Sequence, residues 1–238
     1  MCIRDSLRLW LRPKLVVLYL LTAPFLLGAG LPIVWGNATR FFTVDIIPSP
    51  LRNGEGIAGL APWLGDLLWY QALPGIGTTL VLTQIALVGT GIVALLTFPL
   101  ISRLFVDRFC QVPGHGLLII GRSVPEYLLA YILLQLWGPS MLPAVVALVI
   151  HNGAIIGHLI GRQSSILKLR PDVVSGFNRY TYEVVPRLYR SFLSFLLYRW
   201  EIIMRETAIL GILGITTLGF YVDSAIQELR FDRAIVLI

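Results

Sequence analysis

The sequence predicts an all-α, polytopic membrane protein, and its composition is the first reason. Of the 238 residues, 56% are hydrophobic and 13% are charged, which is about half the charged fraction of a typical soluble domain. The mean hydropathy is +0.79. The charges are also gathered between long uncharged runs, as expected when apolar segments cross a bilayer.

The net charge, the cysteine spacing and the lack of catalytic motifs disfavour several function classes. The net charge of +6 does not indicate nucleic-acid binding, because membrane proteins retain Arg and Lys on their cytoplasmic side. Cys2 and Cys110 have no CxxC or metal-site spacing, so no disulfide framework is expected. Residues 75–79 lack the Lys of a phosphate-binding loop, and no Ser/His/Asp or HExxH pattern occurs. We expect no catalytic residue, bound cofactor or metal on this chain.

Apolar runs define the expected spans. The uncharged run over residues 127–161 cannot be one crossing, because 35 helical residues would measure about 52 Å against a hydrocarbon core of about 30 Å. Gly138, Pro139 and Ser140 predict the turn that divides it. Arg122 and Glu126 then stand one helical turn apart, where they could pair. The first four spans are expected at residues 15–35, 76–102, 117–137 and 141–160.

The remaining segments complete the expected organisation. Residues 36–73 are rich in Gly, Pro and Asn and predict a loop, with one short interfacial helix near residues 63–70. A fifth span starts near Ser191, and the glycine-punctuated residues 210–219 favour a bent or re-entrant segment. Residues 234–238 begin a further apolar run, so we expect the bundle to be truncated near the sixth span. Residues 1–6 have no apolar or amphipathic pattern and are taken as an artefact of the reading frame.

Charge predicts the orientation. Residues 161–190 carry six basic and two acidic residues, whereas residues 36–73 carry two basic and three acidic ones. Because basic residues stay on the cytoplasmic side, the N-terminus and residues 161–190 are predicted to be cytoplasmic. The domains expected are a cytoplasmic N-terminus at 1–14, a first span with its outside loop at 15–72, and a transmembrane domain at 73–238.

Charged residues within the fifth span form the strongest local signal. Glu201 and Arg205 can pair along one helical face, and Arg199 precedes them. Charges within a span usually face the protein interior or an aqueous cavity. The three side chains therefore indicate either a translocation-path or gating element, or else a structural ion pair or side chains that reach toward the span end.

The fourth span carries two further patterns. Gly153, Gly157 and Gly161 recur on one face, where a neighbouring backbone can approach closely. Plain helix packing is the favoured interpretation, and a contact within a moving core is the alternative. His151 and His158 share a face but lack a third ligand or acidic partner, so His151 with Asn152 is interpreted as a polar contact or the lining of a wet path rather than a metal site.

Three segments carry a resemblance to a known family. They are Arg-Ser-Val-Pro-Glu at 122–126, the stretch 147–159 that contains His-Asn-Gly, and residues 192–201, which end in Tyr-Arg-Trp-Glu and precede Leu-Gly at 210–211. With these segments, residues 73–238 resemble the permease subunits of bacterial binding-protein-dependent ABC importers, and phosphonate importer permeases most of all. The resemblance implies a type I importer permease-like helical bundle.

The resemblance also implies a cytoplasmic loop at about 161–190 that docks on a separate ATPase. Pro186 matches the terminal Leu-Pro of the family motif, Val173 stands where the family has Gly, Gly176 lies ten residues before Pro186, and no Glu-Ala-Ala is present. The coupling residues expected from this position in the chain are Arg170, Asp172, Val173, Gly176, Arg179, Tyr182 and Pro186.

The function implied is that of a non-catalytic transmembrane subunit of an ATP-driven importer in the bacterial inner membrane. Its implied partners are a cytoplasmic ATPase dimer that binds ATP, a second permease subunit in a homodimer, a periplasmic or extracellular solute-binding protein, and the lipid bilayer, with no nucleic acid. Arg199 or Arg205 is the expected contact for a small oxyanion, phosphonate first and phosphate or phosphite as alternatives. A stand-alone gradient-driven carrier or a membrane scaffold protein is the rival reading, although no paired repeats with interrupted helices are visible.

Overall fold

The structure is a computed structural model that describes residues 14–25, 34–138, 140–170 and 176–238. Within these ranges all regular secondary structure is helical, which confirms the all-α fold class. The chain divides into two compact units, residues 1–47 and residues 48–238, and the two are described separately.

The first unit contains short helices. An apolar helix runs over Lys14–Phe25, and α2 (Trp35–Arg40) passes directly into the π-helical turn η1 (Phe41–Asp45). Arg40 and Asp45 form an ion pair of 3.7 Å. The first span expected at residues 15–35 includes residues 26–33, which lie outside the described part of the chain.

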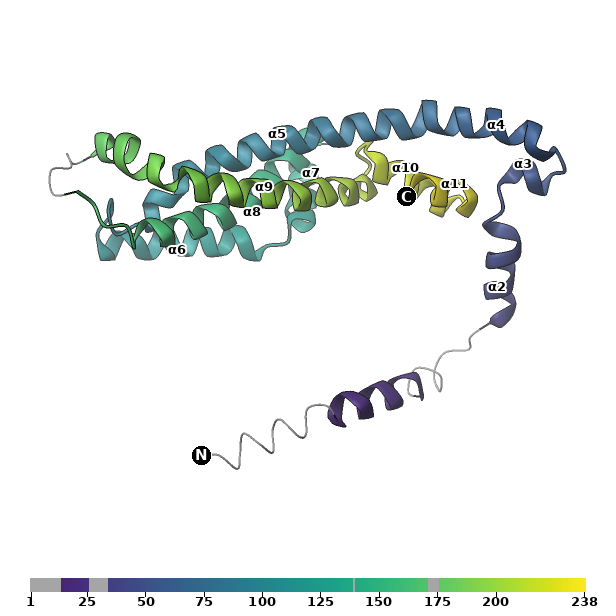
Figure 1. Ribbon diagram of the computed structural model, residues 1–238, viewed down its shortest axis with the longest axis horizontal. Helices are drawn as coiled ribbons and strands as arrows, with labels where there is room; N and C mark the ends of the chain where they lie inside the picture. The colour runs from purple at the N-terminus through teal and green to yellow at the C-terminus, as the bar shows by residue number, and fades with distance from the viewer. Residues whose placement is uncertain (1–13, 26–33, 139, 171–175) are drawn as a thin grey trace. The chain divides into compact units, whose positions relative to one another are not determined.

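A continuous helix of 46 residues, Gly56–Ile101, opens the second unit (Figure 1). It comprises α4 (Gly56–Leu67), η2 (Leu68–Ala72), α5 (Leu73–Thr97) and the 3-10 turn η3 (Phe98–Ile101). Residues 56–72 were expected to be loop apart from a short interfacial helix near residues 63–70, because of their Gly and Pro content. The structure differs because Leu67 and Ala72 are buried in a cluster with Leu237, from the far end of the chain, so tertiary packing outweighs local propensity.

The expected third span is broken in the structure. It consists of α6 (Arg108–Ser123) and α7 (Glu126–Trp137), whose axes are bent by 91°. The break occurs at Val124, which adopts an extended backbone with φ −77° and ψ 122°. Pro125 disfavours the helical conformation for the residue before it. Arg122 and Glu126 are therefore not on consecutive turns of one helix, and the pairing expected between them does not appear among the salt bridges of the described residues.

Helix α8 (Met141–Ser164) is the centre of the second unit. It follows a turn at Gly138, whose φ of +82° lies in the left-handed region that glycine tolerates. Side chains of α5, α8 and α9 form two buried clusters, one around Leu148 and Ile203 and the other around Phe98, Ile156 and Leu188. The three helices run side by side (Figure 1).

The chain then returns through α9 and ends in three short helical segments. The π-helical turn η4 (Arg179–Val184) leads into α9 (Val185–Ile209), which is followed by η5 (Leu210–Leu213), α10 (Leu218–Gln227) and α11 (Phe231–Leu237). A bend of 43° separates α9 with η5 from α10, as the glycine pattern predicted, and Gly214 at the bend has φ +85°. Asp232 of α11 is buried and accepts a hydrogen bond of 3.0 Å from the Ser49 amide in α3 (Ser49–Arg52).

Length and composition alone identify which helices of the described part can cross a bilayer. Gly56–Ile101 and Met141–Ser164 each qualify, and the α6–α7 and α9–α10 pairs raise the number to four if each bent pair is one span. The chain is therefore a multi-span helical membrane protein.

Candidate functional site

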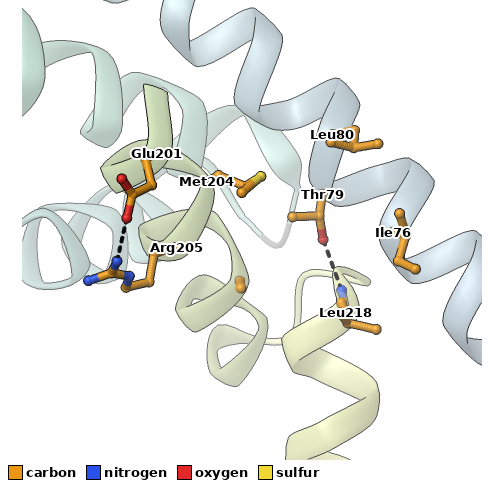
Figure 2. A pocket seen from close by; sticks show the side chains of 8 residues that line it. Ile76, Thr79, Leu80, Glu201, Met204, Arg205 and Leu218 are labelled. Carbon is orange, nitrogen blue, oxygen red and sulfur yellow. Dashed lines mark hydrogen bonds and ion pairs between the residues drawn. The ribbon is translucent and has the colours of Figure 1, made fainter. Parts of the chain in front are cut away.

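Helix α9 carries a polar face that is exposed along its whole length. The face consists of Arg190, Ser194, Tyr198, Glu201 and Arg205, which are spaced three or four residues apart and so lie within one narrow sector of the helix. Glu201 and Arg205 form an ion pair of 2.8 Å, with 67% and 70% of their side chains exposed (Figure 2). We call these five residues the polar face of α9.

An exposed ion pair of this kind adds little to stability. Such pairs contribute about 0–1 kcal/mol in water, whereas each charge placed against lipid near mid-membrane costs about 2.5–3.5 kcal/mol or more. The polar face of α9 therefore has to be covered by water or by another polypeptide when the helix is in a bilayer. The pair, whose two residues are both on α9, therefore does not hold this helix to the rest of the chain.

A hollow of about 410 Å³ lies beside Arg205, between α5, α9 and α10. Its walls are mainly apolar and include Ile76, Leu80, Met204 and Leu218. Figure 2 shows the Thr79 hydroxyl at its edge, which accepts a hydrogen bond of 3.0 Å from the Leu218 amide and so joins α5 to the start of α10.

The opposite side of α9 carries a second polar group, which faces α8. Glu206 accepts a hydrogen bond of 2.9 Å from the side-chain amide of Asn152, and Asn152 is completely buried. Arg199, seven residues before Glu206, acts on its carboxylate electrostatically. Arg199 and Glu206 are therefore on the inner face of α9, away from Glu201 and Arg205.

His151 connects the α6–α7 break to this inner group. One ring nitrogen, Nδ1, lies 2.9 Å from the carbonyl oxygen of Val124, the residue at the break. The other, Nε2, lies 3.7 Å from the carboxylate of Glu126. A broken span leaves backbone groups without helical partners, so the imidazole satisfies a carbonyl that would otherwise be orphaned. We call Glu126, His151, Asn152, Arg199 and Glu206 the inner network.

The structure thus divides the five residues proposed for the path. Glu201 and Arg205 lie on the exposed face, while Arg199, His151 and Asn152 belong to the inner network. Glu126 and Glu206 were not among the expected site residues. Glu206 could have been found from its spacing of seven residues from Arg199, since two charges on one face of a span indicate a shared environment.

Among the described residues expected to couple to an ATPase, Arg179 lies at the start of η4, against the α5–α6 connection. Arg179 donates a hydrogen bond of 2.9 Å to the Leu104 carbonyl. Next to it, Tyr180 donates one of 3.1 Å to the Leu95 carbonyl and stacks on Phe98 with ring centroids 5.4 Å apart. The start of η4 is thereby fixed to the α5–α6 connection.

Other members of the expected coupling set are exposed. Arg170 and Pro186 are exposed, Tyr182 is 79% exposed, and Gly176 has φ +80°. Phe177, beside Gly176, is also 77% exposed. Asp172 and Val173 lie outside the described residues. The surface of the loop is therefore apolar and aromatic at Phe177 and Tyr182.

The three glycines of α8 lie against α5 and η3. A Cβ atom on Gly153 would meet Val93, one on Gly157 would meet Thr97, and one on Gly161 would meet Ile101 and the Phe98 carbonyl. These positions thus bring two long helices into close backbone contact. In the described part of the chain, no group of three or more His, Cys, Asp or Glu side chains could hold a metal ion.

Comparison with known proteins gives low but extended identity. Phosphate-import permease protein PhnE of Mycolicibacterium smegmatis is 25% identical over 212 residues, which cover 83% of this chain and 39% of that protein. The putative phosphite transport system permease protein HtxC of Stutzerimonas stutzeri is 22% identical over 222 residues, covering 89% of this chain and 71% of that protein. The chain is a relative of phosphate- and phosphite-transport permeases.

A third permease relative agrees with this result. Phosphite transport system permease protein PtxC of Stutzerimonas stutzeri is 22% identical over 123 residues, which cover 49% of this chain and 45% of that protein. No protein-family model and no solved structure matches the chain. The relatives confirm the resemblance to importer permeases, and the chain spans 39% of the length of PhnE.

Proposed function

We propose that this chain is the transmembrane subunit of an ATP-driven importer for a small oxyanion. Phosphate, phosphite and phosphonate are the candidate substrates. The names of the permease relatives support the transport of phosphorus oxyanions. In this proposal the chain is not catalytic, a separate cytoplasmic ATPase binds ATP, and a solute-binding protein delivers the substrate from outside.

The exposed polar face of α9 is the observation that carries the proposal. Because charges on a spanning helix avoid lipid, this face lines a water-filled path or meets a second subunit. When two copies of the chain face one another through α9, the polar face contacts a second subunit and also lines the path between the two copies. Arg205 then supplies the guanidinium that recognises an oxyanion through two parallel hydrogen bonds, and Glu201 holds the guanidinium when no substrate is present.

The inner network gives the path a rigid wall. Through the Asn152–Glu206 hydrogen bond, α9 is tied to α8. His151 ties α8 in turn to the beginning of α7. A movement of α9 therefore carries the neighbouring spans with it, which is what alternating access between two packed arrangements requires.

The loop before α9 is suited to receive force from an ATPase. Phe177 and Tyr182 are exposed at its surface, while Arg179 and Tyr180 between them are bonded to the α5–α6 connection. In this proposal the loop and the N-terminus face the cytoplasm, which the excess of basic residues at 161–190 supports. Displacement of the loop is thus transmitted to both α5 and α9.

Uptake in cells tests the proposal. The full-length protein is expressed with its neighbouring ATPase and binding protein in bacteria that lack their own phosphorus-oxyanion importers, and uptake of labelled phosphate, phosphite and a phosphonate is measured. Arg205→Gln is expected to reduce uptake of the substrate by about tenfold or more, because one charge-assisted hydrogen-bond pair to an anion is worth roughly 1.5–3 kcal/mol. The matched control is Arg52→Gln, which removes an exposed arginine of α3.

Two results would contradict the proposal. Uptake that survives Arg205→Gln and Arg199→Gln alike would remove the oxyanion role of both arginines. Purification as an active transporter that needs no ATP would favour the gradient-driven carrier. Co-purification with the ATPase that is lost on Phe177→Asp with Tyr182→Asp, and kept in Arg52→Gln, would support the importer.

A further inference from the structure

A small hollow opens between the first part of the long helix Gly56–Ile101 and α11. Its volume is about 250 Å³, which is below the range typical of pockets for drug-sized ligands. Most of its lining residues come from α4 and η2, at positions three or four residues apart that share one helical face. They are Trp63, Asp66, Leu67, Tyr70 and Gln71, and they are joined by Arg233 of α11. We call this space the α4–α11 hollow.

Packing holds the two walls of the hollow together. Trp63 and Leu67 pack in one cluster with Leu237, the last residue of α11. Asp232, the residue before Arg233, is buried and accepts a hydrogen bond from the Ser49 amide. The positions of both walls therefore do not depend on the charged side chains that line them. A site whose walls are fixed in advance loses little conformational freedom when a ligand binds.

The hollow has two opposite charges that do not pair. Asp66 and Arg233 both line it, but neither takes part in any of the salt bridges formed by the described residues. Nearby, Arg230 and Glu228 do pair, at 3.3 Å. A ligand with both charges, separated from one another, would satisfy Asp66 and Arg233 at the same time. The hollow is therefore complementary to a zwitterion.

The surroundings of each charge indicate which group it binds. The planar guanidinium of Arg233 suits an oxyanion, to which it can donate two parallel hydrogen bonds. Trp63 and Tyr70 line the same hollow as Asp66, and aromatic rings beside a carboxylate favour an ammonium group. The side-chain amide of Gln71 can donate to the oxyanion or accept from the ammonium group.

The hollow lies well beyond the end of α8. Helices α5 and α8 run in the same direction with Gly153 against Val93, so Met141 at the start of α8 is level with about Val81. Gln71 is therefore about 15 Å further along the long helix. Helix α8 alone, with 24 residues, measures about 36 Å and already exceeds a hydrocarbon core of about 30 Å. The hollow consequently opens to water rather than to lipid.

We propose that the α4–α11 hollow binds a small, water-soluble zwitterion, with its ammonium group at Asp66 and its oxyanion group at Arg233. The site is separate from the polar face of α9 and goes beyond the transport function proposed above. The bound ligand bridges α4 and α11 through charges that are unpaired without it. Binding therefore stabilises the folded protein.

Thermal unfolding of the purified full-length protein tests the site in dodecyl maltoside micelles, because this detergent has no charged group. The probes are phosphoethanolamine, which has both charges, and its two halves, inorganic phosphate and ethylammonium, at equal ionic strength. For a 238-residue chain, a ligand at about a hundred times its dissociation constant raises the midpoint by roughly 5–10 °C. Phosphoethanolamine should reach this rise at about tenfold or more lower concentration than either half, because its two contacts are linked.

Single substitutions separate the two contacts. Asp66→Asn should remove the advantage of phosphoethanolamine over phosphate, because both then bind through Arg233 alone. Arg233→Gln should abolish the rise with either of them. The matched control, Glu228→Gln with Arg230→Gln, removes one charge of each sign from the exposed ion pair beside α11 and should keep the full response. Asp66 is exposed, so Asp66→Asn gives a result even if Arg233→Gln does not fold.

The proposal is overturned if phosphoethanolamine does not stabilise the protein, or if either half alone does so equally well. It is also overturned if the control pair loses as much of the response as Asp66→Asn. Stabilisation by phosphatidylethanolamine mixed into the micelles, without any by phosphoethanolamine, would mean that a lipid headgroup occupies the hollow, which contradicts a soluble ligand.

Failure of this proposal is distinguishable from failure of the transport proposal, because uptake is tested with α9 variants and the α4–α11 hollow has no lining residue on that helix. A protein that imports an oxyanion normally and does not respond to phosphoethanolamine would reject the hollow alone.

Discussion

Helices α8 and α9 are nearly equal in length, at 24 and 25 residues, but they treat polar side chains in opposite ways. Helix α8 buries Asn152, whose side-chain amide bonds to Glu206 of α9, and His158, whose ring meets that of His115 on α6. Helix α9 exposes a continuous polar face, including Glu201 and Arg205. Polar side chains thus face the interior of the chain in one helix and its surface in the other.

The difference shows that a charge in a span is not by itself a sign of a path. Glu206 and Arg205 are adjacent in the sequence, yet Glu206 bonds to Asn152 of α8 and Arg205 bonds to Glu201 of its own helix. A buried polar group with a partner contributes to folding, whereas an exposed one requires something outside the chain. Substitutions of buried residues in α8 should therefore lower the thermal midpoint more than substitutions in the polar face of α9. Substitutions in the polar face should in turn reduce uptake more.

Gly161→Leu should have the largest effect on stability. A side chain there would meet Ile101 and the Phe98 carbonyl oxygen, 2.9 Å from the new Cβ, and overpacking against backbone costs about 3 kcal/mol or more. We expect loss of the monodisperse peak in size-exclusion chromatography in detergent. Gly77→Leu is the control, because a Cβ there meets nothing within 4 Å. Equal behaviour of the two variants would contradict the close α5–α8 contact.

Asn152→Leu should have an intermediate effect. It removes the donor to the Glu206 carboxylate, and an unsatisfied buried acceptor costs about 2 kcal/mol. The thermal midpoint should fall accordingly. Asn152→Leu with Glu206→Leu should recover much of the loss, because removing both partners of the hydrogen bond leaves neither of them unpaired, although Arg199 then lacks its acidic neighbour. Losses that simply add in the double variant would show that the hydrogen bond does not tie α8 to α9.

Glu201→Gln with Arg205→Gln should have the smallest effect on stability and a large effect on transport. An exposed pair contributes about 0–1 kcal/mol, so the midpoint should barely move. A loss as large as that of Asn152→Leu would mean that the polar face of α9 is a structural element of the single chain. The comparison between the two helices would then fail.

The sequence predicts the parts of this fold that depend on local pattern. Helix α8 is expected at residues 141–160 and found at Met141–Ser164, because a glycine turn and a basic residue bound an uncharged run. The bend near Gly214 follows from glycine spacing. The break at Val124 could also have been predicted, because Pro125 constrains the residue before it. The length of residues 117–137 instead suggested a single span.

Other features depend on contacts between distant segments. Residues 56–72 are helical because Leu67 packs with Leu237, and no local pattern reveals a neighbour that far along the chain. The inner network likewise joins Asn152 to Glu206, 54 residues apart, and which face of α9 turns inward is fixed by packing on α8. The sequence therefore identifies the charged residues of α9, and only the packing separates the two faces.

The continuous helix Gly56–Ile101 has a mechanical consequence. Its 46 residues measure about 69 Å at 1.5 Å per residue, more than twice the roughly 30 Å hydrocarbon core. Leu67 and Ala72 of this helix pack with Leu237, and its far end carries Phe98, on which Tyr180 of η4 stacks. The helix is therefore long enough to reach beyond both faces of a hydrocarbon core, and the π-helical turn at Leu68–Ala72 is where we expect it to flex.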